Sequence, residues 1–203
     1  MTDPSSENRS PFDWEHRFRT KDAPWERGAV HPAVAHWLAT GALAPGARVY
    51  VPGCGRGLEP KALAEAGLEV TASDVAPSAA AYQWEALKPY PHARIVEADS
   101  LDWRPDTPFD ALYEQTFLCA IHPRQRDTYE AMAFQVLKPG GKLLALFMQK
   151  DERGGPPYGC SVPAMRKLFP DTRWIWPEPE AFTPFPHPNL GGKAELGGVL
   201  TRR

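Results

Sequence analysis

Residues 49–57 (Val-Tyr-Val-Pro-Gly-Cys-Gly-Arg-Gly) constrain the fold more than any other stretch of this chain. Their first part is β-branched and aromatic, which favours a short strand, and three glycines follow within five positions. Residues 58–66 then carry the apolar spacing of a helix. A strand, a glycine turn and a helix in this order bring backbone N–H groups and a helix N-terminus close to a nucleotide. The stretch therefore predicts a nucleotide site in an α/β fold.

The spacing of the glycines and the acid that follows them narrow the choice of nucleotide. A dinucleotide fingerprint requires G-x-G-x-x-G, whereas this turn reads Gly53-x-Gly55-x-Gly57, which is similar to the turn of Rossmann-like methyltransferases. Residues 68–74 form a second expected strand, which ends in Asp74. Because an ionised carboxylate only accepts hydrogen bonds, Asp74 is suited to hold the two vicinal hydroxyls of a ribose. The alternative is a plain glycine-rich turn in which Asp74 caps a helix.

Strands and helices alternate along most of the chain, which predicts a doubly wound, Rossmann-like α/β sheet with helices on both faces. Residues 143–148 are wholly apolar, as expected for a strand that helices cover on both sides. A helix-stop turn is expected at 137–142, and the C-terminal part adds a helix at 163–169 and strands at 172–176 and near 195–201. The remaining expected strands are 49–51, 68–74, 93–99 and 109–114, and the remaining helices 31–43, 58–66, 77–87 and 124–137.

Length and charge limit the classes of partner. The chain has 203 residues and a net charge of −2, so neither nucleic acid nor an anionic membrane is indicated. Three widely separated cysteines show no zinc-type spacing, and no metal is expected. The odd cysteine count and the lack of an apolar N-terminal segment predict a cytoplasmic protein. Residues 1–10 are expected to be flexible and residues 11–203 to form one domain, whose oligomeric state the sequence does not indicate.

Aromatic residues gather ahead of the first expected strand, at Trp14, Phe18 and Trp25. A helix that packs these rings on the core would explain them, and so would a lid that folds over the ligand. The Pro-containing stretch around Trp25 indicates a turn, which places Trp25 and Arg27 on a loop.

Polar residues end several of the expected strands. Since ligands bind at the C-terminal edge of an open parallel sheet, the glycine turn, Asp74, Asp99–Ser100 and residues 114–116 should converge. Asp99 and Ser100 are candidates to hold an adenine edge, although both residue types also favour turns for local reasons.

Four stretches, in order, resemble the thiopurine S-methyltransferase superfamily and in particular its thiol/halide/thiocyanate methyltransferase branch. They are residues 51–55 (VPGCG), 109–121 (FDALYEQTFLCAI), 137–141 (LKPGG) and 154–158 (GGPPY), and the likeness extends from about Trp14 to the C-terminus. The resemblance implies S-adenosylmethionine as cofactor and S-adenosylhomocysteine as product. It also implies a small methyl acceptor, namely a thiol, sulfide, thiocyanate, halide or thiopurine sulfur.

The resemblance further implies roles for single residues. The N-terminal aromatics would close over the cofactor, with Phe18 in place of the usual Trp. Glu114 stands where the family commonly has Asp, and Gln115 replaces a Tyr or Arg. Tyr158 falls in the loop that lines the nucleophile pocket. Together with the rest of the glycine turn, the expected cofactor-binding residues are Trp14, Phe18, Trp25, Gly53, Cys54, Gly55, Gly57, Asp74, Asp99, Ser100 and Gln115.

Methyl transfer from a sulfonium is an in-line displacement, which needs alignment and exclusion of water rather than a covalent catalyst. Arg27 by its charge and Tyr158 by a hydrogen bond are the candidates for attracting a small anion, and Glu114 is the third expected catalytic residue. Arg27 would otherwise be a surface residue. His31 and His122 are candidate proton acceptors that would otherwise cap or pack.

Two competing interpretations remain open. A nucleotide-dependent oxidoreductase has the same architecture, but the glycine spacing disfavours it. A protein that binds S-adenosylmethionine without turnover is the other, and the intact turn, acid and Pro-Pro-Tyr loop argue against it.

Overall fold

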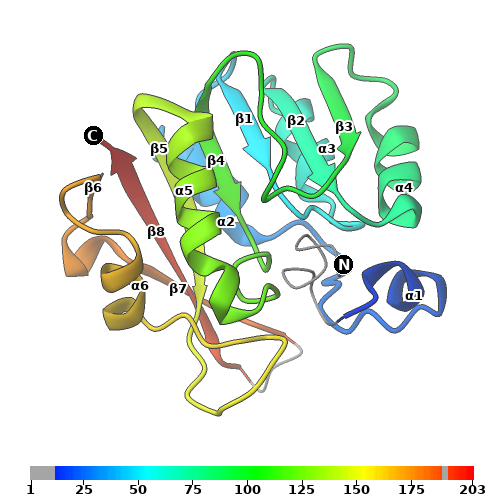
Figure 1. The fold of residues 1–203 in the computed structure, drawn as a ribbon. Helices are drawn as coiled ribbons and strands as arrows, with labels where there is room; N and C mark the ends of the chain where they lie inside the picture. Colours follow the sequence, from blue (N-terminus) through cyan, green and yellow to red (C-terminus); the bar gives the residue numbers. More distant parts are fainter. Residues whose placement is uncertain (1–11, 189–191) are drawn as a thin grey trace, which may run out of the picture.

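The structure is a computed structural model of the chain, and it describes residues 12–188 and 192–203. The prediction of a flexible segment at 1–10 lies outside the described residues. A central sheet runs through the molecule, with α5 and α6 on one face and α2 and α3 on the other (Figure 1). The predicted doubly wound α/β fold is confirmed.

From β1 to β4 the elements follow the predicted alternation, and only their bounds differ from the prediction, by a few residues. The helices are α1 (Trp14–Arg19), α2 (Pro32–Ala39), α3 (Glu59–Glu65), α4 (Pro77–Leu87), α5 (Arg126–Val136) and α6 (Val162–Leu168). The strands are β1 (Arg48–Val51), β2 (Glu69–Asp74), β3 (Ala93–Glu97), β4 (Phe109–Glu114), β5 (Leu137–Met148), β6 (Trp174–Ile175), β7 (Thr183–Pro186) and β8 (Ala194–Arg202).

Strand order places the ligand edge of the sheet. The order is β3-β2-β1-β4-β5-β8-β6, and β7 also pairs with β8. Strands β1 to β5 are mutually parallel, so their C-terminal ends share one edge. The order reverses direction between β1 and β4, which makes this the switch point where such sheets bind ligands.

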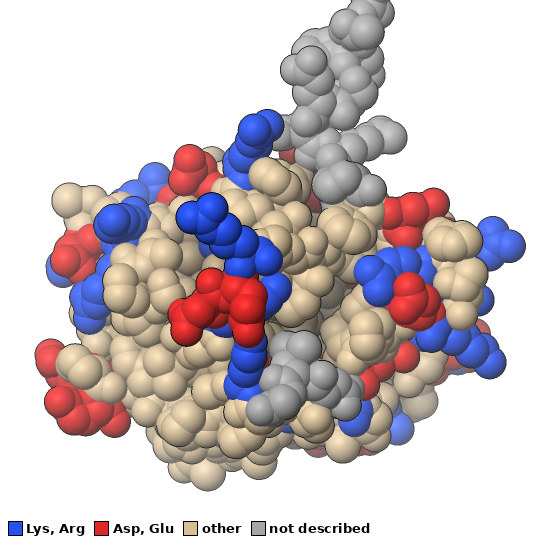
Figure 2. Space-filling model, turned by 90° about the horizontal axis from the view of Figure 1, so that it is seen from below, with Lys and Arg blue, Asp and Glu red and all other residues tan. Residues whose placement is uncertain are grey.

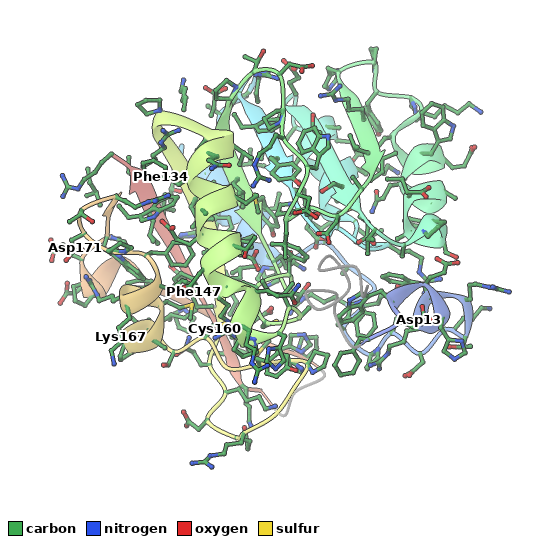
Figure 3. All side chains as sticks on the ribbon, in the orientation of Figure 1. Asp13, Phe134, Phe147, Cys160, Lys167 and Asp171 are labelled. Atoms are coloured by element: carbon green, nitrogen blue, oxygen red, sulfur yellow. The ribbon has the colours of Figure 1, made fainter. Side chains whose placement is uncertain are left out.

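Side chains alternate between two hydrophobic cores along each central strand, because successive residues point to opposite faces. Val49 and Val51 pack with Trp37 of α2 in one core, whereas Tyr50 packs with Tyr129 of α5 in the other. Figure 3 labels Phe147 of β5 and Cys160, which both belong to the α5–α6 core. Burial on both faces explains the continuous apolar run predicted to be the fifth strand.

The C-terminal third adds to the prediction or departs from it at three points. Strand β8 runs antiparallel to β5. Strand β5 starts at Leu137, so residues 137–142, which were expected to form a turn, belong to the strand. The register with β4 breaks in this stretch, since Phe109 pairs with Leu137 and Ala111 with Lys142. Strand β7 was not predicted, since its Thr-Pro-Phe-Pro sequence lacks two N–H donors and is tolerated only at an edge.

Candidate active site

A cavity of about 1220 Å³ opens at the C-terminal edge of the parallel strands. Small-molecule pockets span roughly 300–1,000 Å³, so this one has room for two small molecules side by side. Figure 2 views the molecule from this edge, where acidic and basic side chains are mixed. We divide the cavity wall into two halves and name each half after the strands beside it. The β1–β3 half comprises the N-terminal aromatics, the 53–57 turn, Asp74 and the 99–102 turn. The β4–β8 half comprises Arg27, residues 115–117 and 119–121, Met148, Pro156, Pro157 and His187.

The glycine turn presents bare backbone to the cavity. Gly53 and Gly55 have φ angles of 55° and 52°, in the left-handed region that favours glycine. A Cβ on Gly53 would lie 2.2 Å from Cδ2 of Phe117, and a Cβ on Gly55 would lie 3.1 Å from Cζ of Phe18. Aromatic rings therefore close on the turn from both halves. The wall includes all of the predicted turn residues, Gly53, Cys54, Gly55 and Gly57.

Asp74 ends β2 directly beside this turn. Its Oδ2 accepts a hydrogen bond from the Gly55 N–H at 2.8 Å, and its Oδ1 accepts one from the Ala76 N–H at 2.9 Å. Burial raises the pKa of Asp74, and these backbone bonds oppose that rise. Each carboxylate oxygen has two acceptor positions, so both can accept a further bond from a ligand hydroxyl. Asp74 lines the cavity, as predicted.

Ser100 and Asp99 differ in what they offer the cavity. The buried Ser100 hydroxyl accepts the Gly53 N–H at 3.0 Å and joins the Ser73 hydroxyl at 2.7 Å, which in turn meets the Tyr50 hydroxyl at 2.7 Å. Asp99 is exposed at the cavity, and its Oδ1 accepts the backbone N–H two residues on at 2.9 Å. Ser100 thus holds the turn, and Asp99 has the carboxylate that a ligand can reach.

The N-terminal aromatics form a small core of their own and also line the cavity. The ring centroids of Trp14 and Trp25 lie 5.5 Å apart, and those of Phe18 and Trp25 lie 5.8 Å apart. Phe18 is buried against Ala76 and Ala79 at the start of α4. The cluster packs as a core and also lines the cavity, so the alternative of a lid over the ligand stays a prediction.

Two polar contacts attach this segment to the glycine turn and to α4. Arg56, within the turn, binds Glu26 with both ends of its guanidinium, at 2.7 and 3.1 Å. Glu15 of α1 accepts hydrogen bonds from the Ser78 N–H and hydroxyl at 2.9 and 2.6 Å. These hydrogen bonds from Ser78 lower the pKa of Glu15.

Glu114 lies beneath the cavity wall rather than in it. It is buried, and its carboxylate accepts the Leu118 N–H at 2.8 Å and the Tyr129 hydroxyl at 2.7 Å. Burial raises the pKa of Glu114 to about 7. The carboxylate holds the 115–121 segment from below, and its expected catalytic role stays a prediction. Within that segment Thr116 has a φ of 61°, a conformation that a non-glycine residue adopts only when its surroundings hold it.

The predicted residues Gln115 and Tyr158 have different outcomes. Gln115 lines the cavity, and its Oε1 accepts the Tyr113 hydroxyl at 2.8 Å. Tyr158 stays outside the wall, with its N–H bound to the Cys119 carbonyl at 2.7 Å and its ring 5.6 Å from that of His122. The two preceding prolines line the wall, and the expected contact between Tyr158 and an acceptor stays a prediction.

Arg27 lines the cavity, but its charge is already balanced. Its Nη1 lies 2.9 Å from Oε2 of Glu195 on β8, and its expected role of attracting a small anion stays a prediction. The same Glu195 oxygen lies 3.1 Å from Nε2 of His31. His31 Nδ1 accepts the Ala33 N–H at 3.0 Å, so His31 caps α2, and its Nε2 is the nitrogen that carries a proton. The structure thus favours the capping role for His31 over proton acceptance.

Sequence comparisons agree with this geometry. Residues 9–175 match the thiopurine S-methyltransferase family. A probable thiol methyltransferase 2 of Arabidopsis thaliana is 35% identical over 81% of this chain and 74% of its own length. A thiopurine S-methyltransferase of Azotobacter vinelandii is 28% identical over 79% of this chain and 82% of its own length.

The chain belongs to the thiopurine S-methyltransferase family. The predicted family is thereby confirmed, and with it the prediction of a methyltransferase. A 1,6-didemethyltoxoflavin-N1-methyltransferase of Burkholderia thailandensis, solved with S-adenosylhomocysteine, shares the fold at a TM-score of 0.68 and 22% identity, over 93% of this chain and 83% of its own. A glycopeptide N-methyltransferase with S-adenosylhomocysteine has a TM-score of 0.68 at 17% identity, over 88% of this chain and 92% of its own. Both agree with the predicted cofactor.

The residues present in this family member fit S-adenosylmethionine. An adenosyl group requires close access to backbone, a carboxylate with spare acceptor positions and a wall of aromatic rings. The β1–β3 half holds all three, with the access at Gly53 and Gly55. Asp74 would hold the ribose, Asp99 the adenine edge, and Trp14, Phe18 and Trp25 would cover the cofactor.

Three features of this site were not predicted. Gln83 of α4 donates from Nε2 to the carbonyls of Gly55 at 3.0 Å and Gly57 at 2.8 Å, and so fastens the turn. His187, which follows β7, lines one end of the cavity, and Glu195 of β8 pairs with Arg27 of the same wall. Nothing in their local sequence indicates a site, because only the folded sheet brings them to Arg27 and His31.

Proposed function

We propose that this methyltransferase moves the methyl group of S-adenosylmethionine to the sulfur of a small acceptor. The observation that carries the proposal is one cavity with two unlike halves: a ribose-type acid and a glycine turn on one side, a mainly apolar wall on the other. When bound, S-adenosylmethionine supplies a methyl group on a positively charged sulfur. The protein has to align the acceptor with it and to exclude water.

The β4–β8 half supports a small, soft acceptor. Phe117, Cys119, Met148 and the two prolines give it an apolar surface, and the buried Cys119 thiol donates to the Thr116 carbonyl at 3.4 Å. Burial raises the pKa of Cys119 well above its ordinary value, so its thiol stays protonated and acts as wall rather than nucleophile. Thiols, sulfide, thiocyanate and thiopurines all present such a sulfur. Halides remain the competing acceptors.

Further properties follow from the same residues. The three cysteines are free, which suits a reducing compartment, and we place the protein in the cytoplasm. Among the described residues no helix is long and apolar enough to cross a membrane. With a net charge of −2, its partner is a small molecule and not nucleic acid.

The test is a screen of acceptors with purified protein and S-adenosylmethionine. We expect S-adenosylhomocysteine release, and a methylated product by mass spectrometry, with at least one sulfur acceptor and far less with oxygen or nitrogen analogues of the same size. A reaction without acceptor measures background hydrolysis. Tight binding of S-adenosylhomocysteine by calorimetry together with no methylated sulfur product from any acceptor would refute the proposal.

A further inference from the structure

Glu59, the first residue of α3, is a buried carboxylate that has no role in the site as described so far. It follows the glycine turn by two residues, is 5% exposed and lines the cavity. Its Oε1 accepts the His31 N–H at 2.9 Å. This is the one hydrogen bond that the Glu59 side chain makes among the residues that the structure describes, and none of their ion pairs includes it.

The other buried carboxylates of the described chain are better satisfied. Each of them has at least two polar partners; they are Asp74, Glu114, Glu130 and Glu195. Burying a carboxylate costs free energy unless it is paired and hydrogen-bonded. Because Glu59 lines the cavity, a bound molecule can supply the missing partner.

The free oxygen of Glu59 lies against the glycine turn. A Cβ on Gly57 would lie 2.6 Å from Oε2 of Glu59, so the absence of a side chain at position 57 leaves room for this oxygen. Glu59 also faces β4, since burial and, after it, the charge of Glu59 raise the pKa of Tyr113, which lines the cavity as well. Glu59 therefore lies where the two halves of the cavity meet.

The charges around Glu59 favour a cationic group. Arg27 is balanced by Glu195 at 2.9 Å, and Arg56 of the turn is likewise paired with a carboxylate. The His31 imidazole is neutral, because its Nδ1 accepts a backbone N–H. Among these groups the negative charge of Glu59 is the one without a counterpart, and a ligand cation would balance it.

We propose that Glu59 binds the α-ammonium group in the amino-acid part of S-adenosylmethionine and S-adenosylhomocysteine. Each free acceptor position of Oε2 can take one N–H of an ammonium group. The same charge repels the α-carboxylate, so this contact also selects how the amino-acid part is oriented. Asp74 and Glu59, one on each side of the turn, would then hold the ribose and the amino acid. The inference rests on the proposed function for its methyl donor and not for its acceptor.

Two nucleosides separate this role from a structural one, because 5′-methylthioadenosine is a thioether like S-adenosylhomocysteine but lacks the amino-acid part. We expect Glu59→Gln to weaken S-adenosylhomocysteine binding about 10- to 100-fold by calorimetry, the range for a hydrogen bond to a charged group. Its affinity for 5′-methylthioadenosine should stay unchanged, since Gln keeps an acceptor for the His31 N–H. Glu65→Gln is the matched control, because Glu65 is on the same helix, exposed and outside the cavity wall. Asp74→Ala should weaken the binding of both nucleosides.

An analogue of S-adenosylhomocysteine with hydrogen in place of the α-amino group identifies the group that Glu59 meets. The wild type should bind this analogue about 10-fold more weakly or worse, and Glu59→Gln should cause no further loss. Circular dichroism checks the fold, and Glu59→Asp, which retracts the carboxylate and should show the same pattern, replaces the Gln variant if that does not fold. Equal losses for both nucleosides, an equal loss for the analogue, or no loss for S-adenosylhomocysteine would overturn the role of Glu59. Failure of the wild type with every sulfur acceptor would instead refute the proposed function and leave this role standing.

Discussion

The two halves of the cavity are built in different ways. The β1–β3 half depends on backbone: the Gly53 and Gly55 N–H groups meet Ser100 and Asp74, and a Gln83 side chain holds the turn carbonyls. The β4–β8 half depends on side chains, among them the Arg27–Glu195 pair and the apolar wall around Phe117. A constant ligand suits a backbone cradle, and a variable acceptor suits replaceable side chains. We therefore expect mutations in the two halves to separate cofactor affinity from acceptor turnover.

The largest effect should come from Gly53→Ala, which acts where the halves meet. Strain at a positive φ and overpacking against Phe117 each cost about 1–3 kcal/mol. We expect the affinity for S-adenosylhomocysteine, measured by calorimetry, to fall about 10- to 100-fold. Gly46→Ala is the control, because Gly46 has a φ of 80° and nothing within 4 Å of the added Cβ. Gly46→Ala carries similar backbone strain and should leave the affinity unchanged. Equal losses in both variants would show that backbone strain alone lowers the affinity, and not crowding between position 53 and Phe117.

A smaller, pH-dependent effect should come from Glu114→Gln in the β4–β8 half. The pKa of Glu114 rises from 4.5 to about 7 on folding, so its contribution to stability is full below pH 4.5 and is lost as the pH rises through 7. A tenfold change in the proton affinity of one group corresponds to about 1.4 kcal/mol of unfolding free energy. Gln does not titrate and keeps an acceptor for the Leu118 N–H. Urea unfolding should therefore show the wild type losing stability relative to the variant between pH 5 and 8. The exposed Glu65→Gln is the control, and a pH-independent difference for Glu114→Gln would argue against this account.

The smallest effect concerns how the N-terminal segment is held to the β1–β3 half. Glu26→Gln, Arg56→Gln and the double variant form a mutant cycle on a half-buried ion pair. We expect a coupling of about 0.5–1 kcal/mol in the affinity for S-adenosylhomocysteine. The Arg48–Glu69 pair, 3.1 Å apart and outside the cavity, should show none. Coupling of the same size in both pairs would mean that the contact does not tie the segment to the site.

The sequence predicted the β1–β3 half well because its parts are contiguous. One strand, one turn and one following acid lie within about 25 residues, and the spacing alone locates them in an α/β fold. Glu195 and His187 lie more than 150 residues from Arg27 and His31, and an antiparallel last strand brings them together. No local pattern encodes such a meeting. The places of Glu114 and Tyr158 outside the lining residues could not be predicted either, because position in a motif does not say toward which side of the wall a side chain points.

The central claim is that the two halves hold different partners of one methyl transfer. It is tested most directly by measuring S-adenosylhomocysteine affinity and saturated thiol turnover on Asp74→Ala and His187→Gln. We expect Asp74→Ala to weaken the affinity by roughly 1.5–3 kcal/mol, with some loss of stability because Gly55 and Ala76 lose their acceptor, and to keep turnover near normal at saturating cofactor. His187→Gln changes a residue that lines the β4–β8 half and should show the reverse, normal affinity and low thiol turnover. If both variants change both quantities to the same extent, the division of the cavity into a cofactor half and an acceptor half is contradicted.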